Sequence, residues 1–162
     1  MGLDDAVVAS WHLDPVTLRE TVDDRAALEY ERGVAAPVDR SWLLRVLGRS
    51  RAAVVEGQLL LTTAEDPWRL LLLVAHAHHW LGEWVEAARL QDDALRRAVN
   101  TPREATTRQH IGKRLLDEGR GAEAVVQLVL ALQLREAAGV DADLVRSSRA
   151  ALLRARVANG AR

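Results

Sequence analysis

The sequence contains no cysteine and no phenylalanine, and it has one methionine, one tyrosine and 4 prolines in 162 residues. Lys113 is the only lysine, so arginine carries nearly all of the positive charge. Without cysteine the chain can form no disulfide, offers no thiol nucleophile and has no thiolate ligands for zinc or an iron–sulfur cluster. The scarcity of proline, together with 10 glycines, also excludes a disordered or turn-rich chain.

An excess of charge of one sign and long apolar runs are also absent. The formal net charge is −1, whereas a protein that binds nucleic acid through phosphate contacts is usually visibly basic. The longest apolar run, residues 70–75, is far too short to span a bilayer, and residues 1–5 lack the basic start of a signal peptide. We therefore expect a soluble cytoplasmic protein with neither a nucleic-acid nor a membrane partner.

Residues with high helix propensity dominate the composition of the chain. Hydrophobic residues make up 49 % of the chain, and the abundance of alanine, leucine, arginine, glutamate and valine favours helix over strand. A length of 162 residues suffices for one domain with a hydrophobic core and is short for two. No linker or low-complexity tract divides the chain. The composition thus predicts a single all-α domain.

Two stretches of the chain repeat each other at an offset of 37 residues. Small and apolar residues recur in the order Val74, Ala75, Gly82, Ala87, Ala94, Leu95 and then Ile111, Gly112, Gly119, Ala124, Ala131, Leu132. A third copy precedes them, since Gly48 lies 34 residues before Gly82 and Ala53 lies 34 before Ala87. Repetition at a period of about 20 to 50 residues is typical of a solenoid.

Each copy reads as two helices joined at its glycine. We expect these helices at about 38–47, 51–64, 67–81, 84–99, 103–118 and 121–137. Asp66-Pro67 and Thr101 are capping and first-turn residues that favour a helix start. Gly57 stands in the second helix of the first copy where a bulky residue is expected, which costs roughly 1 kcal/mol relative to alanine.

The N-terminal residues are expected to be helical as well. Asp14-Pro15 is a favoured helix start, and Gly33 suits a helix stop, which predicts one helix over about 15–32. Its apolar stripe has a spacing of four residues and consists of Leu18, Val22, Ala26 and Tyr30. One or two further helical turns are predicted within residues 3–13 from Leu3, Val7, Val8 and Trp11.

A last helix is expected from Asp141 to about residue 158. Its apolar stripe would cover the end of the array, as a terminal repeat of a solenoid must, and residues 159–162 would form a frayed tail. This helix also carries Arg146, Arg149, Arg154 and Arg156. Because no helix-turn-helix reading element accompanies them, we expect these arginines to keep the cap soluble.

The three copies resemble the tetratricopeptide repeat, a helix-turn-helix of about 34 residues. That family favours a small residue in its first helix, glycine at the turn, and alanine, an aromatic residue and alanine in its second helix. In the last copy these places hold Gly112, Gly119, Ala124, Leu128 and Ala131; in the central copy Ala75, Gly82, Ala87, Gln91 and Ala94; and in the first copy Ser41, Gly48, Ala53, Gly57 and Leu60. The aromatic residue of the second helix is missing from every copy.

The resemblance implies a right-handed α-solenoid of antiparallel helix pairs. Its three repeats would span about 34–66, 67–101 and 102–140, between an N-terminal helical extension at 1–33 and the capping helix at 141–158. The small residues have a physical role, because two helices approach closely only where small side chains face each other, and the turn needs a flexible backbone.

The resemblance also implies a protein-interaction module, since the first helices of successive tetratricopeptide repeats line a concave groove. Carried over by position, the groove residues are Trp42, Arg45, Arg69, Leu72, His76, His79, Gln109, Lys113, Leu116 and Asp117. This mixture suits a protein partner that offers a peptide or helix with acidic or apolar anchors. The most specific prediction is that His76 and His79 lie beside Gln109 and Lys113.

Other functions find less support in the sequence. His76 and His79, with His110 on a neighbouring helix, could approach a zinc ion, but no carboxylate stands at a recognised spacing, and we expect no metal or other cofactor. No phosphate-binding loop, nucleophile elbow or metalloprotease motif occurs, so we do not expect an enzyme. The alternative that stays open is a self-associating regulatory or sensor domain of a bacterial signalling or transcription system.

Overall fold

The computed structural model describes residues 10–14, 17 and 19–160. Within them, a small two-stranded sheet precedes eight helices, and the all-α fold class is confirmed. The elements are β1 (Trp11–Leu13), β2 (Glu20–Val22), α1 (Arg25–Val34), α2 (Pro37–Val46), α3 (Ser50–Leu61), α4 (Trp68–Trp80), α5 (Trp84–Ala98), α6 (Glu104–Asp117), α7 (Gly121–Ala137) and α8 (Ala142–Gly160). No helix in these ranges is long and apolar enough to cross a membrane.

Helices α2 to α7 lie where the repeated pattern predicts helices, with ends that agree within one helical turn. The offset of 37 rather than 34 residues between the last two copies has a simple source. Helix α5 has 15 residues and α3 has 12, so the central copy contains almost one extra helical turn.

The three predicted turns have the same backbone structure. Gly48, Gly82 and Gly119 have φ angles of 82°, 74° and 86°, in the left-handed region that favours glycine. At each turn the glycine N–H donates to the carbonyl three residues earlier, and the next N–H donates to the carbonyl five residues earlier. This pair of bonds satisfies carbonyls at the helix end that would otherwise lack partners. The repeat in sequence is therefore also a repeat in backbone conformation.

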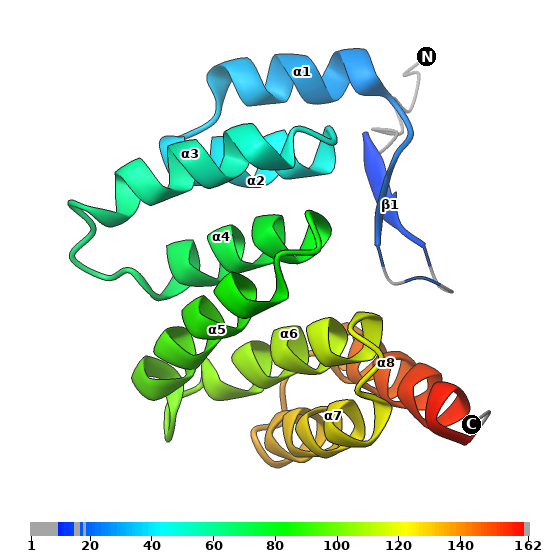
Figure 1. Cartoon of the computed structure of the whole chain (residues 1–162). Helices are drawn as coiled ribbons and strands as arrows, with labels where there is room; N and C mark the ends of the chain where they lie inside the picture. The colour runs from blue at the N-terminus through cyan, green and yellow to red at the C-terminus, as the bar shows by residue number, and fades with distance from the viewer. Residues whose placement is uncertain (1–9, 15–16, 18, 161–162) are drawn as a thin grey trace, which may run out of the picture.

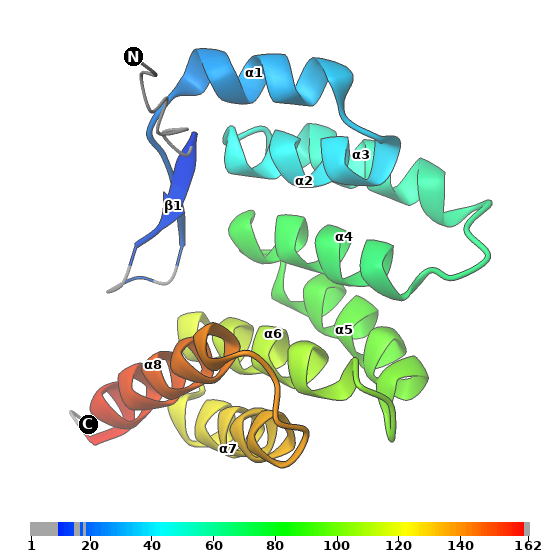
Figure 2. The same cartoon turned by 180° about the vertical axis from the view of Figure 1, so that it is seen from behind.

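The helices follow one another along the stack from α1 to α7, and α8 lies against α6 and α7 at its end, as Figures 1 and 2 show from opposite sides. Each of α1 to α7 contacts the helix that follows it, and a second set of contacts joins α2 to α4, α4 to α6, and α6 to α8. We call α2, α4 and α6 the inner row. Four hydrophobic clusters follow one another along the stack, so the core is distributed over successive helix pairs.

Small residues allow the closest helix approaches. A Cβ atom added at Gly112 on α6 would lie 2.5 Å from Leu128 Cγ on α7, and one added at Gly57 on α3 would overlap Val74 on α4. The expectation that Gly57 weakens its copy is therefore incomplete. The absent side chain is what lets α3 and α4 pack together, so the loss of helix propensity is offset by closer packing.

The helix expected over about 15–32 is wrong in its first half. Residues Glu20–Val22 form a strand paired antiparallel with Trp11–Leu13, in the register Trp11 with Val22, and α1 begins only at Arg25. The expected apolar stripe does not exist, since Tyr30 is 73 % exposed and Leu28 is the buried residue of α1. Gly33 lies inside α1, and the turns expected before residue 10 fall outside the described residues, as does Leu18.

The Asp14 side chain accepts hydrogen bonds as a helix cap would, but these bonds stabilise a turn of the hairpin and not the start of a helix. The Asp14 carboxylate accepts hydrogen bonds from the Thr17 N–H at 2.6 Å and the Thr17 hydroxyl at 2.8 Å, and the Asp14 N–H donates to the Arg19 carbonyl. Asp residues favour turns as well as helix starts for the same reason. The N-cap of α1 is instead Asp24, whose side chain accepts from the Ala27 N–H at 3.0 Å.

Helix α8 covers the last repeat and is held there by a buried arginine. The Arg135 guanidinium on α7 donates to Gln109 on α6, to the Leu144 carbonyl at 2.9 Å and to the Ser148 hydroxyl at 2.8 Å. Helix α8 extends to Gly160, with Asn159 packed beside Gly121, so the frayed tail predicted at 159–162 is wrong for residues 159 and 160, and residues 161–162 fall outside the described part of the chain.

Candidate functional site

The exposed face of the inner row contains a cavity of about 250 Å³. Side chains from α2, α4 and α6 line it, together with Glu20 from the hairpin. Trp42, Trp68, Leu72 and Leu73 supply apolar surface, while the polar lining comes from Glu20, Arg45, Arg69, His76, Thr106 and His110. The Trp68 ring is fixed by its N–H, which donates to the Thr107 hydroxyl at 2.9 Å.

A second hollow of about 530 Å³ adjoins the first and is lined by the end of α1 and by α2 and α4. The two hollows share Trp42, Arg69 and Leu73. We call the combined surface around Trp42, Trp68, Arg69, Leu72 and Leu73 the open groove. Arg69 forms an exposed ion pair with Asp39 at 2.5 Å, so charged groups border an apolar floor.

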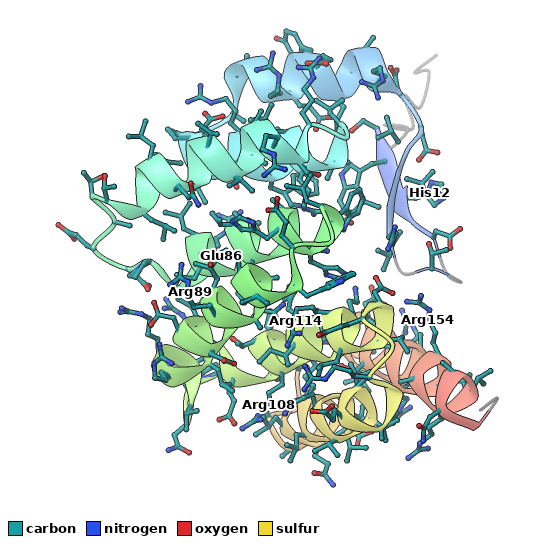
Figure 3. The ribbon with its side chains drawn as sticks, viewed as in Figure 1. His12, Glu86, Arg89, Arg108, Arg114 and Arg154 are labelled. Carbon is teal, nitrogen blue, oxygen red and sulfur yellow. The ribbon has the colours of Figure 1, made fainter. Side chains whose placement is uncertain are left out.

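The hairpin covers the other part of the inner row, at one side of the helix stack (Figures 1 and 2). Glu20 accepts two hydrogen bonds from the Arg45 guanidinium, at 2.6 and 3.0 Å. Arg19 pairs with Asp117 on α6 at 3.2 Å. Arg154, which Figure 3 shows on α8 toward the hairpin, donates to the Thr17 carbonyl at 3.0 Å. The hairpin thus connects α2, α6 and α8.

The Arg45 side chain is the most buried of the charged groups beneath the hairpin, with 1 % of its surface exposed. Its guanidinium lies 4.9 Å from the centre of the Trp80 ring, which adds a cation–π contact to the ion pair with Glu20. Burial of Glu20 works to raise its pKa, but the hydrogen bonds and charge of Arg45, with a smaller effect of Lys113, lower the pKa below its ordinary value. The carboxylate is therefore ionised at neutral pH.

Three histidines meet on this face. The His76 ring lies 5.4 Å from the rings of both His79 and His110, measured between centroids. Burial, with the positive charges of Arg45 and Lys113, lowers the pKa of His76 and lowers that of His110 to about 3. Both imidazoles are therefore neutral at neutral pH, and they add no positive charge to the face.

The partly buried position of His110 predicts a loss of stability in mild acid. Its pKa of about 3 in the folded chain lies below the ordinary value of 6.5, so below pH 6.5 the unfolded chain binds the extra proton. Lowering the pH from 7 to 5 is expected to cost about 2 kcal/mol of unfolding free energy through this residue. Urea unfolding at the two pH values, compared between wild type and His110→Gln, measures it.

The control for this measurement is Leu59→Gln, which changes an exposed residue of α3 and no titratable group. This variant is expected to keep the wild-type loss between pH 7 and 5, whereas His110→Gln loses about 2 kcal/mol less than wild type. An equal loss in His110→Gln and wild type would show that His110 is not buried in its neutral form.

Five of the ten predicted groove residues line the cavity, namely Trp42, Arg45, Arg69, Leu72 and His76. The other five lie elsewhere or are used inside the molecule. His79 is 4 % exposed and bonds to Asp117 at 2.9 Å, and Leu116 belongs to the core cluster of α6 to α8. Lys113 lies close enough to Glu20 for each charge to shift the pKa of the other.

The prediction that Gln109 lies on the groove wall with the histidines is wrong. Its amide bonds to Arg135, to the Ser148 hydroxyl at 2.7 Å and to the Ser147 hydroxyl at 3.1 Å, all on α7 and α8. The neighbouring residue, His110, instead faces His76. The reason is rotation about the helix, because adjacent residues point about 100° apart and α8 covers the side on which Gln109 emerges.

Five residues that line the cavity were not predicted as groove residues from the sequence, namely Glu20, Trp68, Leu73, Thr106 and His110. Trp68 could have been found, because an aromatic residue directly after Pro67 stands at the exposed start of an inner-row helix. Glu20 could not, because its role depends on a hairpin that helical spacing obscured. Among the described residues, no group of three or more histidine and acidic side chains is placed to hold a metal ion, although His76, His79 and His110 do meet.

Comparison with known proteins adds no relative. The chain matches no protein-family model, and no curated protein or solved structure is significantly similar to it. The tetratricopeptide resemblance therefore remains a prediction that rests on the repeated residues themselves.

Proposed function

We propose that this chain is a tetratricopeptide-like α-solenoid that works without catalysis, as a protein-interaction module. Its open groove would bind an extended peptide or a helix of another protein. The observation that carries the proposal is the open groove itself, two adjoining hollows with an apolar floor on the inner row. Two tryptophans and two leucines at one concave surface are the residue types that anchor protein partners.

The packing supports the solenoid. The second set of contacts, from α2 to α4 to α6 to α8, is what a superhelical stack of helix pairs requires, with one helix of each pair on the inner side. The three turns have matching hydrogen bonds, and Ser41, Ala75 and Gly112 are buried at equivalent places in α2, α4 and α6. A right-handed superhelix with the first helices lining the groove accounts for all of these features.

The groove favours a partner with an apolar anchor. Leu73 is half-buried and lines both hollows, so it lies at their junction, and Trp42 and Trp68 stand on either side of it along the inner row. An apolar side chain buried there would gain the usual 25 cal/mol for each Å² removed from water, or roughly 1.5 to 3 kcal/mol for one leucine-sized anchor. Arg69 and Asp39 would then form a polar rim.

Peptide selection tests the proposal. A phage-displayed library of random peptides is selected on the immobilised full-length chain, and fluorescence anisotropy gives the affinity of an enriched synthetic peptide. We expect Leu73→Arg to weaken binding by at least about tenfold, because it places a charge on the apolar floor. The matched control is Leu59→Arg, at a leucine of α3 that is 70 % exposed outside the groove, which should leave the affinity unchanged.

Two outcomes would contradict the proposal. One is that the library yields no peptide that binds the folded chain in solution. The other is that Leu59→Arg weakens binding as much as Leu73→Arg, which would move the binding surface to the outer helices.

A further inference from the structure

We propose that the hairpin formed by β1 and β2 is an internal competitor for the inner row. The partner would carry an acidic side chain that replaces the Glu20 carboxylate on Arg45. This inference rests on the proposed function, because it names the chemistry of the segment that enters the groove. Glu20 lines the same cavity as Trp42 and Leu72, so the hairpin and a bound partner would meet there.

Arg45 is built as a receptor for one carboxylate. Its guanidinium is buried, lies against the Trp80 ring and donates from both terminal nitrogens to Glu20. Its Nε is one of two buried side-chain nitrogens in the described ranges that have no hydrogen-bond partner. A planar donor group fixed in this way can bind a carboxylate at two points, whether that carboxylate comes from the hairpin or from another chain.

Charge selects what can replace the hairpin. If Glu20 left without a substitute, Arg45 would lose the only carboxylate that pairs with it among the described residues. A buried charge without a counterion is strongly unfavourable, so a neutral or basic segment gains little by displacing the hairpin. An acidic segment restores the ion pair and also meets the positive charge of Lys113, which already acts on Glu20.

The hairpin is attached unequally along its length. At its base, the Trp11 ring packs edge-on against Trp42 at 5.1 Å, and Val22 joins the cluster around Leu28. Beyond Glu20, the contacts of the described hairpin residues with the helices include the Arg19 pair with Asp117, the Arg19 guanidinium 5.7 Å from the Trp80 ring centre, and the bond from Arg154 to a backbone carbonyl. Two strands of three residues are only marginally stable without such support, so Glu20 can leave Arg45 while Trp11 and Val22 keep their contacts with the helices.

The test uses the hairpin sequence itself as a probe. One synthetic peptide has residues 10–23, and its matched control has Glu20→Gln. The full-length Glu20→Gln protein has lost its internal carboxylate, and calorimetry is expected to show the glutamate peptide binding at least about tenfold more tightly than the glutamine peptide. Wild type should bind the glutamate peptide more weakly than this variant does, because its own hairpin competes at an effective concentration of about millimolar. Adding Arg45→Gln to the variant should abolish the difference between the peptides.

Hydrogen exchange provides a second measurement that needs no variant. With several millimolar glutamate peptide, the Asp14 amide of wild type, which donates to the Arg19 carbonyl, should exchange faster, and the amides of α4 should not change. Equal binding of both peptides by a folded Glu20→Gln protein would overturn the inference, as would unchanged exchange in wild type. The groove proposal is judged separately by the library peptides and Leu73→Arg, so either idea can fail alone.

Discussion

Replacing Glu20 by glutamine is expected to lower the free energy of unfolding by about 3 kcal/mol, because it leaves the buried Arg45 guanidinium without its counterion. The Glu20 side chain is 12 % exposed and that of Arg45 is 1 % exposed, so water can solvate neither charge well once the pair is broken. Urea denaturation at pH 7, followed by circular dichroism, measures the loss.

Two further variants separate the charge effect from packing. Glu86→Gln breaks an exposed pair with Arg89 on α5, labelled in Figure 3, and should cost less than about 0.5 kcal/mol because exposed pairs contribute little. Arg45→Met combined with Glu20→Gln should be more stable than Glu20→Gln alone, since no charge is then left buried. If the double variant is no more stable than the single one, the cost does not come from the unpaired guanidinium.

Truncating Leu128 to alanine is expected to cost about 3 kcal/mol of unfolding free energy. The side chain is 0 % exposed and belongs to the cluster that joins α6, α7 and α8. Its removal deletes buried methyl groups and leaves a cavity between helices that cannot fully close. Thermal and urea unfolding of Leu128→Ala measure the effect, and Leu153→Ala, at a leucine of α8 that is 65 % exposed, should change stability by no more than about 0.5 kcal/mol.

The close approach of Gly112 and Leu128 predicts that substitutions at these two residues do not have independent effects on stability. Gly112→Ala alone should cost about 2 kcal/mol, because its methyl group would lie 2.5 Å from Leu128 Cγ. Combined with Leu128→Ala, the new methyl group fills part of the space that the leucine leaves, and the double variant should lose less than the sum of the single losses. Additive losses would mean that α6 and α7 do not meet at these two residues.

The helices and their turns could be predicted because their causes are local. Apolar residues at helical spacing define the buried faces, and a glycine at φ above zero ends a helix with hydrogen bonds that involve only its last turn. Five of the ten residues that line the cavity are expected in the groove from the tetratricopeptide resemblance, namely Trp42, Arg45, Arg69, Leu72 and His76.

The rest of the site depends on contacts between distant residues. Gln109 occupies a place expected in the groove, but α8 arrives on that side of α6 and its Ser148 takes the amide. A spacing rule derived from one helix cannot say which later helix will cover it. Leu116 and His79 are drawn into the interior for the same reason, by α8 and by Asp117.

The sequence by itself determined an all-α chain with three helix pairs, their turn glycines and the small residues where helices meet, because each of these depends on neighbours within one or two turns. Only the tertiary structure decided that residues 11–13 and 20–22 pair as a hairpin on the inner row. Leu18 and Val22 fit a helical stripe, and the competing strand gains its stability from Trp42 and Arg45, which lie 20 or more residues away along the chain. Local sequence patterns do not contain the stabilisation from the buried ion pair of Glu20 and Arg45, because this pair forms only after the helices have packed. The hairpin held by this pair covers one part of the inner row and leaves the other part as the open groove.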